Sequence, residues 1–326
     1  MTERPAKKSS TSFLQKISSA VKQLKKSRKA NKDLLLQAKV GAKLDAYIEA
    51  LLNGKIEKAN IVAKQPYLVG KNIIWQFWQQ GVDENTPSLV QACLASVQKY
   101  SNGYQVIVVS KDTLSEYVEA LPHYVWEKFG TGGFDFPKIA NLVRLQLLSA
   151  YGGVWLDATI YLTGPLPESW LQHDFFALQR SETIPADASF FIKSDPLFFN
   201  WNPASQVKLL NSFIVAKPHH KIIDDLLAMH YAYWKKETRI DHYFFFQILF
   251  NRMMQYQEWR HLNCGIVGHT DCHRLQMVAF DNYDPDMYTT ITQKSSLHKL
   301  SLYLSRKGLP TASFAAVMLR CSENER

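Results

Sequence analysis

Two almost unbroken apolar runs mark the first strands of the main domain. Residues 72–78 (NIIWQFW) are followed by turn residues at 81–87, and residues 105–109 (QVIVV) form the second run. Such runs predict buried strands, and the segments at 88–100 and 111–121 predict helices. Strands that alternate with helices favour a parallel sheet covered on both faces, whose ligands bind beyond the C-terminal strand ends.

The first 66 residues carry a different pattern. Apolar residues recur there at helical spacing with lysines between them, and predict a basic amphipathic helix with the stripe Phe13, Leu14, Ile17, Val21 and Leu24. Lysines interrupt this stripe too often for a secretory signal. A second helical stretch, residues 33–59, is expected to pack on the body of the protein or on a partner.

The excess positive charge lies in the same segment. The chain has 326 residues, 46% of them hydrophobic, and a net charge of +9. Residues 1–40 hold 11 of the 38 basic and 2 of the 29 acidic residues, which leaves a neutral body. We therefore expect the N-terminus to lie on an anionic membrane surface, with a solvated basic arm as the alternative. A nucleic-acid partner is not expected, because a domain that binds nucleic acid needs basic residues spread over one face.

Cysteine content and hydropathy bear on location. The four cysteines are too few and too scattered for a disulfide framework, which favours a reducing cytoplasm. No apolar run approaches the roughly 18 residues of a transmembrane helix. The expected location is cytoplasmic, peripheral at the inner face of the membrane.

Residues 136–167 (FPKIANLVRLQLLSAYGGVWLDATIYLTGPLP) hold the most informative pattern. A mostly apolar helix at 139–150 would place Asn141 and Arg144 on one face, three residues apart. Its arginine needs an anionic partner, either a core carboxylate or a ligand phosphate. Two glycines end the helix, a short strand follows, and Asp157 comes at the end of that strand, where a carboxylate would reach a ligand.

This pattern resembles the capsular polysaccharide synthesis family of glycosyltransferases, related to glycosyltransferase family 32. It is similar, more distantly, to mannosyltransferases and glucosylating toxins that share a DXD sugar-transfer domain. Further blocks resemble the family in the same order, namely KNIIWQFWQQG at 71–81, NSFIVAKPHH at 211–220, HYFFF at 242–246 and SSLHKL at 295–300.

The resemblance implies both a fold and a reaction. The fold is α/β of the GT-A type, a single Rossmann-like domain with a mixed central sheet at 67–326, behind a basic helical extension at 1–66. The reaction is a metal-assisted and retaining transfer of a sugar from a nucleotide-sugar donor. The acceptor would be a cell-surface polysaccharide, a glycan or a lipid-linked glycan.

Loss of a diphosphate leaving group explains which residue types such a site needs. Asp157 is expected to anchor the donor diphosphate and a Mn²⁺ or Mg²⁺ ion, because hard cations prefer oxygen ligands. Thr159 stands where the second DXD carboxylate would be and, with His298, is an expected weaker metal ligand. Arg144 is expected to bind the donor phosphate or the sugar, and Lys299 the donor phosphate.

Other expected donor contacts are less specific. Trp78 could stack on the base, Asn141 and Asn211 could bond the sugar, with Asn211 near the reacting carbon, and Gly153 would let a ligand approach the backbone. The alternatives are a core tryptophan, a turn asparagine and, for Asp157, a helix cap. For the His298–Lys299 pair the alternative is a solvated surface.

Two departures from the family pattern keep a second function open. Asn141 stands where the family usually has aspartate, and His242 stands where Asp-Tyr-Phe begins. These changes suggest altered donor choice, or a non-catalytic, membrane-associated module that binds a nucleotide sugar or glycan as a scaffold. A zinc site is a weak alternative, since no common finger spacing fits the set Cys264, His269, Cys272 and His273.

Overall fold

The computed structural model describes residues 10–131, 133–306 and 308–323, without the side chains of residues 10–27, 305–306 and 321–323. The α-helices are α1 (Ser10–Leu52), α2 (Ser88–Lys99), α3 (His123–Lys128), α4 (Phe136–Tyr151), α5 (Glu168–Leu171), α6 (Ala188–Ser194), α7 (Lys221–Lys236), α8 (Phe245–Met253), α9 (Gln257–Arg260), α10 (Arg274–Met277), α11 (Pro285–Lys294), α12 (Tyr303–Arg306) and α13 (Phe314–Glu323). The 3-10 helices are η1 (Pro66–Leu68), η2 (Leu114–Glu116) and η3 (Thr270–His273). The strands are β1 (Ile73–Phe77), β2 (Gln105–Val109), β3 (Gly153–Leu156), β4 (Ile160–Leu162), β5 (Phe175–Gln179), β6 (Leu209–Ala216) and β7 (Leu297–Lys299).

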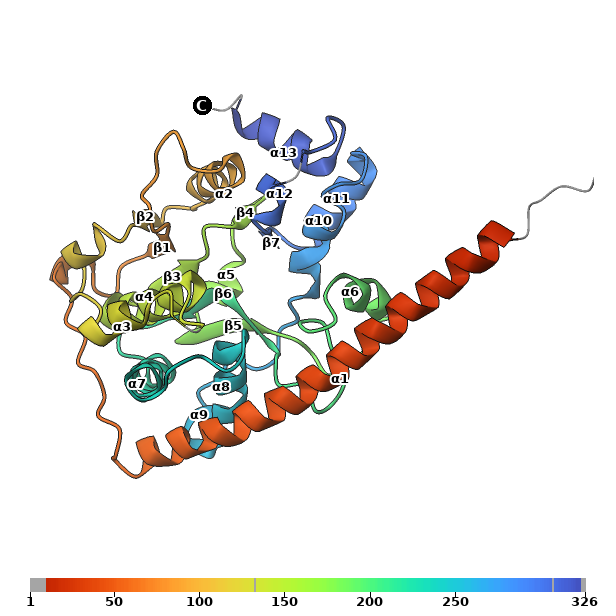
Figure 1. Cartoon of the computed structure of the whole chain (residues 1–326). Coiled ribbons are helices and arrows are strands. Elements are labelled where there is room, and N and C mark those ends of the chain that lie inside the picture. The colour runs from red at the N-terminus through yellow and green to blue at the C-terminus, as the bar shows by residue number, and fades with distance from the viewer. Residues whose placement is uncertain (1–9, 132, 307, 324–326) are drawn as a thin grey trace, which may run out of the picture.

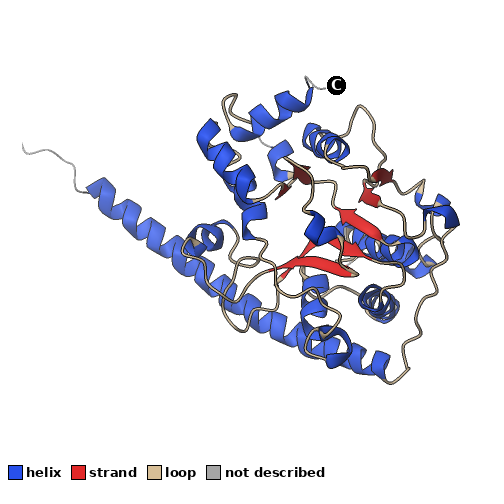
Figure 2. Cartoon of the chain, turned by 180° about the vertical axis from the view of Figure 1, so that it is seen from behind, coloured by secondary structure: helices blue, strands red, loops and turns tan. Residues whose placement is uncertain are grey.

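Five of the described strands form the central sheet, in the order β2-β1-β3-β6-β5. Strand β1 pairs in parallel with β2 and β3, whereas β6 runs antiparallel to both β3 and β5. Figure 2 shows this sheet enclosed by helices. The predicted α/β class with a mixed central sheet is therefore confirmed, and the parallel pairing expected for residues 72–78 and 105–109 is present.

A glycine lets β3 lie close to β1. The backbone of Gly153 has φ +93, and a Cβ atom there would lie 2.6 Å from the carbonyl oxygen of Ile73. The indole of Trp75 donates to the carbonyl of the preceding Gly152, which ends α4 at φ +69. Only glycine meets both demands without strain. The sharp α4–β3 connection therefore places Asp157 directly at the end of a central strand.

The helix expected at 111–121 does not form. Only the short η2 lies there. The hydrogen bonds that Ser110 and Thr113 exchange between their hydroxyl and backbone N–H groups cap the start of this turn. The carbonyl of Tyr117 instead accepts from the N–H of Lys64 and from the hydroxyl of Tyr151, so it is not available to the next turn of a helix.

The two helical stretches expected near the N-terminus are one continuous helix, α1. Its C-terminal half lies along α7 and α8 and buries Val40, Leu44, Ile48 and Leu51 in the main core, while its N-terminal end extends beyond the body (Figure 1). The stripe and the basic side chains expected between Arg4 and Lys26 lie outside the described side chains. The domain boundary at residue 66 stays a prediction. Within the described ranges, no helix is long and apolar enough to cross a membrane.

A second, smaller core completes the fold. Strands β4 and β7 pair antiparallel beside α2, and α10 to α13 close over them (Figure 1). Its buried residues include Leu89, Cys93, Leu275, Leu300 and Phe314. This arrangement brings the C-terminal strand β7 next to the segment that follows β3, so that residues about 140 positions apart in the sequence share one pocket.

Candidate active site

A cavity of about 400 Å³ opens at the C-terminal ends of the parallel strands β1 and β3. Because β6 is antiparallel to β3, its N-terminal end reaches the same edge of the sheet. The lining residues come from the ends of these strands, from α4, α6, α8, η3, α10 and β7, and from the loops between them. The lining includes Trp78, Asn141, Arg144, Asp157, Thr159, Asn211 and Lys299, all of which the sequence predicts as site residues.

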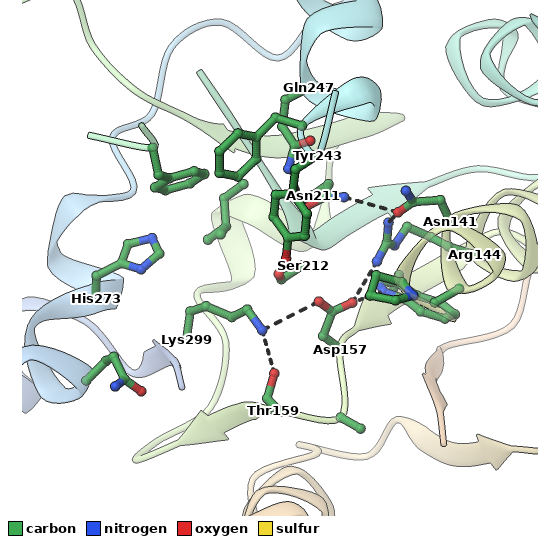
Figure 3. Close-up of a pocket in the computed structure, with 18 of the residues that line it drawn as sticks. Asn141, Arg144, Asp157, Thr159, Asn211, Ser212, Tyr243, Gln247, His273 and Lys299 are labelled. Carbon is green, nitrogen blue, oxygen red and sulfur yellow. Dashed lines mark hydrogen bonds and ion pairs between the residues drawn. The ribbon is translucent and has the colours of Figure 1, made fainter. Parts of the chain in front are cut away.

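The carboxylate of Asp157 lies at the centre of the charged part of this pocket (Figure 3). Its Oδ1 accepts from Arg144 Nη2 at 2.7 Å and from Trp155 Nε1 at 2.8 Å, and its Oδ2 lies 3.6 Å from Lys299 Nζ. Burial alone would raise the pKa of Asp157, but the charges of Arg144 and Lys299 outweigh it and hold the pKa well below its usual range. The carboxylate is therefore ionised at any physiological pH.

Arg144 is almost fully buried and holds two residues of the pocket. Besides Asp157, it donates through Nη1 to Asn141 Oδ1, and its guanidinium lies over the ring of Trp155 at 4.9 Å. Burial lowers the pKa of Arg144 and the neighbouring Asp157 opposes that shift. The sequence left two partners open for this arginine, a core carboxylate or a ligand phosphate. In the structure its partner is the carboxylate of Asp157, which also lines the pocket.

A row of amide side chains borders the charged cluster. Asn211 Nδ2 donates to Asn141 Oδ1 at 3.2 Å, and Gln247 Nε2 donates to Asn211 Oδ1 at 3.0 Å. The amide nitrogen of Asn141 has no hydrogen-bond partner within the described part of the chain. The row therefore orients Asn141 so that a donor group remains for a ligand oxygen.

The expected pair His298 and Lys299 is split between two sides of β7. Lys299 lines the pocket and donates to the hydroxyl of Thr159, whereas His298 is 0% exposed and contacts Thr163 Oγ1 at 3.0 Å. Successive side chains of a strand point to opposite faces, so a lysine in the pocket turns its histidine neighbour away. The structure thus does not bring His298, the expected metal ligand, to the other predicted residues.

Trp78 and Gly153 differ in their relation to the pocket. Trp78 is half-buried, lines the pocket and also packs against Val90, Leu94 and Ala158, and its stacking on a base stays a prediction. Gly153 is not among the lining residues, and its close approach is to β1 rather than to the pocket.

Several lining residues were not predicted as site residues. Tyr243 is 67% exposed and faces Asp157 across the pocket in Figure 3, and Lys138 lies over its ring at 5.1 Å. Tyr243 belongs to the HYFFF block, which was the one available signal. His242 beside it turns away and contacts Asp33 of α1 at 3.1 Å, so its replacement of the family's aspartate does not put a histidine into the pocket.

The weak zinc alternative finds no support in the side-chain arrangement. His269 and His273 pack against Phe198 and Phe199 rather than around a common point with the cysteines. In the part of the chain that the structure describes, no group of three or more His, Cys, Asp or Glu residues gathers to hold a metal.

The carboxylate oxygen of Asp157 that faces the pocket suits a divalent cation that is bound mostly by oxygen atoms of the substrate. The Asp157 side chain remains 25% exposed to the pocket, and its Oδ2 lies 3.6 Å from Lys299 Nζ, an ion pair longer than a hydrogen bond. Hard cations such as Mg²⁺ are commonly bound by one or two carboxylates together with substrate phosphates and water. The residues present therefore fit an ion that takes most of its ligands from a diphosphate and solvent.

Comparison with known proteins yields relatives named as glycosyltransferases. The chain is 31% identical over 153 residues to Glycosyltransferase afumC of Aspergillus fumigatus (strain CBS 144.89 / FGSC A1163 / CEA10), which is 44% of this chain and 36% of the relative. It is 26% identical over 187 residues to O-glycosyltransferase braB of Annulohypoxylon truncatum, which is 54% of this chain and 41% of the relative. The matches thus span less than half of the relatives' own length.

A solved structure and a protein family also match. The structure titled PaToxG Glycosyltransferase aligns with 70% of this chain and 81% of its own, at 11% identity and a TM-score of 0.31, a likeness too small to define a common fold. The family described as Capsular polysaccharide synthesis protein matches residues 21–315, which contain every predicted site residue. This chain belongs to that capsular polysaccharide synthesis family.

Proposed function

We propose that this protein is a glycosyltransferase that moves a sugar from a nucleotide-sugar donor to a hydroxyl group of a cell-surface glycan or glycolipid. One observation carries the proposal: an ionised Asp157, held by Arg144 and Lys299, lies at the base of a 400 Å³ pocket at the strand ends. The family and the names of the relatives support the same reaction class.

The positive side chains have different tasks in this proposal. Arg144 is 3% exposed and donates to both Asp157 and Asn141, so it positions these two residues rather than contacting the donor. Lys299 is 25% exposed and faces the pocket, so its ammonium group can approach the leaving diphosphate. Charge that develops on the leaving group is stabilised most by groups already in position.

A divalent cation would complete the neutralisation of the diphosphate. Asp157 would hold Mn²⁺ or Mg²⁺ through the carboxylate oxygen that faces the pocket, with Thr159 at its edge. When bound, such an ion acts as a Lewis acid on the diphosphate. The side chains of Asn141, Asn211 and Gln247 border this position and would bond the hydroxyl groups of the sugar. We also propose that the transfer retains the anomeric configuration, as the family resemblance implies.

A donor panel tests the proposal. Purified protein is incubated with UDP-glucose, UDP-galactose and GDP-mannose, with and without Mn²⁺, and release of nucleoside diphosphate is measured. The proposal predicts release from at least one donor, and stimulation by the metal. If no donor is cleaved but one binds, the second candidate, a non-catalytic module that binds nucleotide sugars, replaces it. That candidate is favoured by Asn141, which cannot act as a carboxylate.

The proposed place of action is an anionic membrane surface. The N-terminal end of α1 extends beyond the body, and residues 1–40 hold 11 basic residues against 2 acidic ones (Figure 1). Each basic residue near anionic lipid adds about 1 kcal/mol of binding free energy. Deletion of residues 1–32 should therefore release the protein from phosphatidylserine vesicles at low salt while leaving donor cleavage intact. Full-length protein that ignores these vesicles would contradict this localisation.

A further inference from the structure

A histidine that the donor-site description leaves unused lines the other side of the pocket. His273, at the end of η3, is 9% exposed, and its Nε2 has no hydrogen-bond partner among the described residues. In Figure 3 it lies across the pocket from Asp157 and Arg144, with Lys299 drawn between them. A buried polar atom without a partner costs free energy unless a ligand or water bonds to it.

The surroundings of His273 are aromatic and rigid. Its ring lies 4.9 Å from the ring of Phe199, 5.3 Å from that of Phe198 and 5.3 Å from that of His269. These rings fix the direction of the imidazole without using its hydrogen-bonding capacity. Burial lowers the pKa of His273 well below its ordinary value, so the ring is neutral and has one donor and one acceptor nitrogen.

A second polar side chain lies one helical turn further along. Gln276 of α10 also lines the pocket, and its Oε1 accepts from the backbone N–H of Ser301 at 2.7 Å. That bond fixes the orientation of the Gln276 amide, because the oxygen must face the N–H of Ser301. The NH₂ group is then the end that can donate to a ligand. Residues three apart on a helical segment lie on one face, so His273 and Gln276 can contact the same ligand.

The chemistry of this wall differs from that of the Asp157 side. His273, Gln276 and Met277 bear no charge, and the carboxylate of the nearby Asp195 already accepts from the N–H groups of Leu197 and Phe198. A neutral acceptor beside a neutral donor matches an alcohol, which both donates and accepts one hydrogen bond. Lys299, whose charge also lowers the pKa of His273, already contacts Asp157 and Thr159, so an uncharged ligand suits this wall better than a phosphate or carboxylate.

We propose that His273 and Gln276 bind the acceptor substrate through an uncharged hydroxyl group, on the side of the pocket that faces the donor residues. This inference rests on the proposed glycosyltransferase function and names the acceptor side of the same pocket. The acceptor class is a non-ionic alcohol such as a sugar hydroxyl, and the aromatic side chains Phe198, Phe199 and Tyr243 offer apolar surface beside it.

The experiment measures transfer to octyl glucoside, octyl galactoside and octyl mannoside with the donor that the wild type cleaves best. His273→Phe replaces the imidazole by a ring of similar size among the same aromatic neighbours. The acceptor KM should rise at least tenfold while the donor KM changes less than twofold. His269→Phe is the matched control, because His269 is buried among the same rings but does not line the pocket. It should leave both KM values within twofold.

Gln276→Glu is a second variant for the case that His273→Phe does not fold. It keeps an oxygen for Ser301 but removes the amide donor, and it should also raise the acceptor KM at least tenfold. An acceptor KM that stays within twofold in a folded variant overturns the inference. So does wild-type donor cleavage that none of the three glycosides converts into transfer. Failure of the wild type to cleave any donor instead contradicts the proposed function itself.

Discussion

Arg144 divides its guanidinium between two residues of the pocket, donating to Asn141 from one terminal nitrogen and to Asp157 from the other. Without it, Asn141 would keep only the hydrogen bond from Asn211, and Asp157 would keep only neutral donors such as Trp155 and the more distant charge of Lys299. A planar guanidinium can make two directed bonds at once, whereas an ammonium group is a single point charge. The orientation of the site thus depends on the shape of this cation as well as on its charge.

Arg144→Lys should therefore lower donor cleavage at least tenfold, although the charge is kept. The unfolding free energy should fall by about 1–3 kcal/mol, because a buried acceptor loses its donor. Arg252→Lys is the matched control, since Arg252 forms a two-bond pair with Asp45 on α1, outside the pocket lining. An Arg144→Lys protein that melts and turns over like the wild type would remove Arg144 from the site.

The sequence identifies which residue types form the site better than it identifies which side chains face the pocket. The placement of Asp157 follows from a helix, two glycines and a strand, all of which are local. The side of β7 on which Lys299 lies depends on its pairing with β4, which is 135 residues away by the register of Leu162 with Leu297 and is not written in the local pattern. For that reason His298 and Lys299 could not be separated from the sequence.

Helix α1 contacts the segments that carry part of the pocket lining. Lys43 of α1 contacts Glu237 at 2.6 Å and Asp241 at 2.8 Å. Nearer the N-terminus of the same helix, Gln37 accepts from the N–H of Gln206. Asp33 contacts His242, which is the sequence neighbour of the lining residue Tyr243. The helix thus holds the segment that contains Tyr243.

Lys43→Met should loosen this docking. Without the ammonium group, Glu237 and Asp241 lie close together as two like charges, and the unfolding free energy should fall by about 1–2 kcal/mol. Lys39→Met, an exposed lysine one turn away on the same helix, should cost less than about 0.5 kcal/mol. Urea unfolding gives both values, and hydrogen exchange should show faster exchange in residues 33–52 of the Lys43 variant only. Equal effects of the two variants would contradict the docking role.

The elements that sequence patterns place best are those with long apolar runs, such as β1 and α4. The helix expected at 111–121 does not continue past its first turn because the carbonyl of Tyr117 accepts from Lys64 and Tyr151, long-range bonds that a periodicity of apolar residues does not reveal. The unity of α1 was missed for a related reason. Its charged middle section breaks the apolar stripe, and its C-terminal half is stabilised by contacts with α7 and α8 that only the fold supplies.

Across the whole molecule, several histidines are buried in uncharged form. Burial lowers the pKa of His230 and His298 to about 4 and that of His269 to about 3, and lowers the pKa of His273 well below 6.5. Between pH 6.5 and about 4, the unfolded chain binds protons that the folded protein does not. Stability therefore rises with pH in this window and is lost as the pH falls. Well above pH 6.5 these groups are neutral in both states and contribute no pH dependence.

The unfolding free energy should accordingly drop between pH 7.5 and 5.5, by about 1 kcal/mol for each of these histidines. Urea unfolding at pH 7.5, 6.5 and 5.5 gives this dependence directly. His269→Phe should reduce the dependence of the unfolding free energy on pH by the contribution of one histidine, because the variant cannot bind that proton in the unfolded state. A free energy that is constant over this range would show that the buried histidines take up protons without unfolding.

Asp157→Asn tests the central claim, that this carboxylate anchors the metal-assisted cleavage of a nucleotide sugar. Asparagine keeps the oxygen that accepts from Arg144 and Trp155 but lacks the charge that holds a hard cation. Asp225→Asn is the matched control, since Asp225 is also buried between two lysines and a tryptophan N–H, but outside the pocket. The measurement is release of nucleoside diphosphate across a Mn²⁺ titration, in proteins shown to be folded by their melting curves. We expect Asp157→Asn to lose at least 100-fold in rate and its response to Mn²⁺, with Asp225→Asn retaining both; a folded Asp157→Asn protein with wild-type Mn²⁺ dependence would contradict the account.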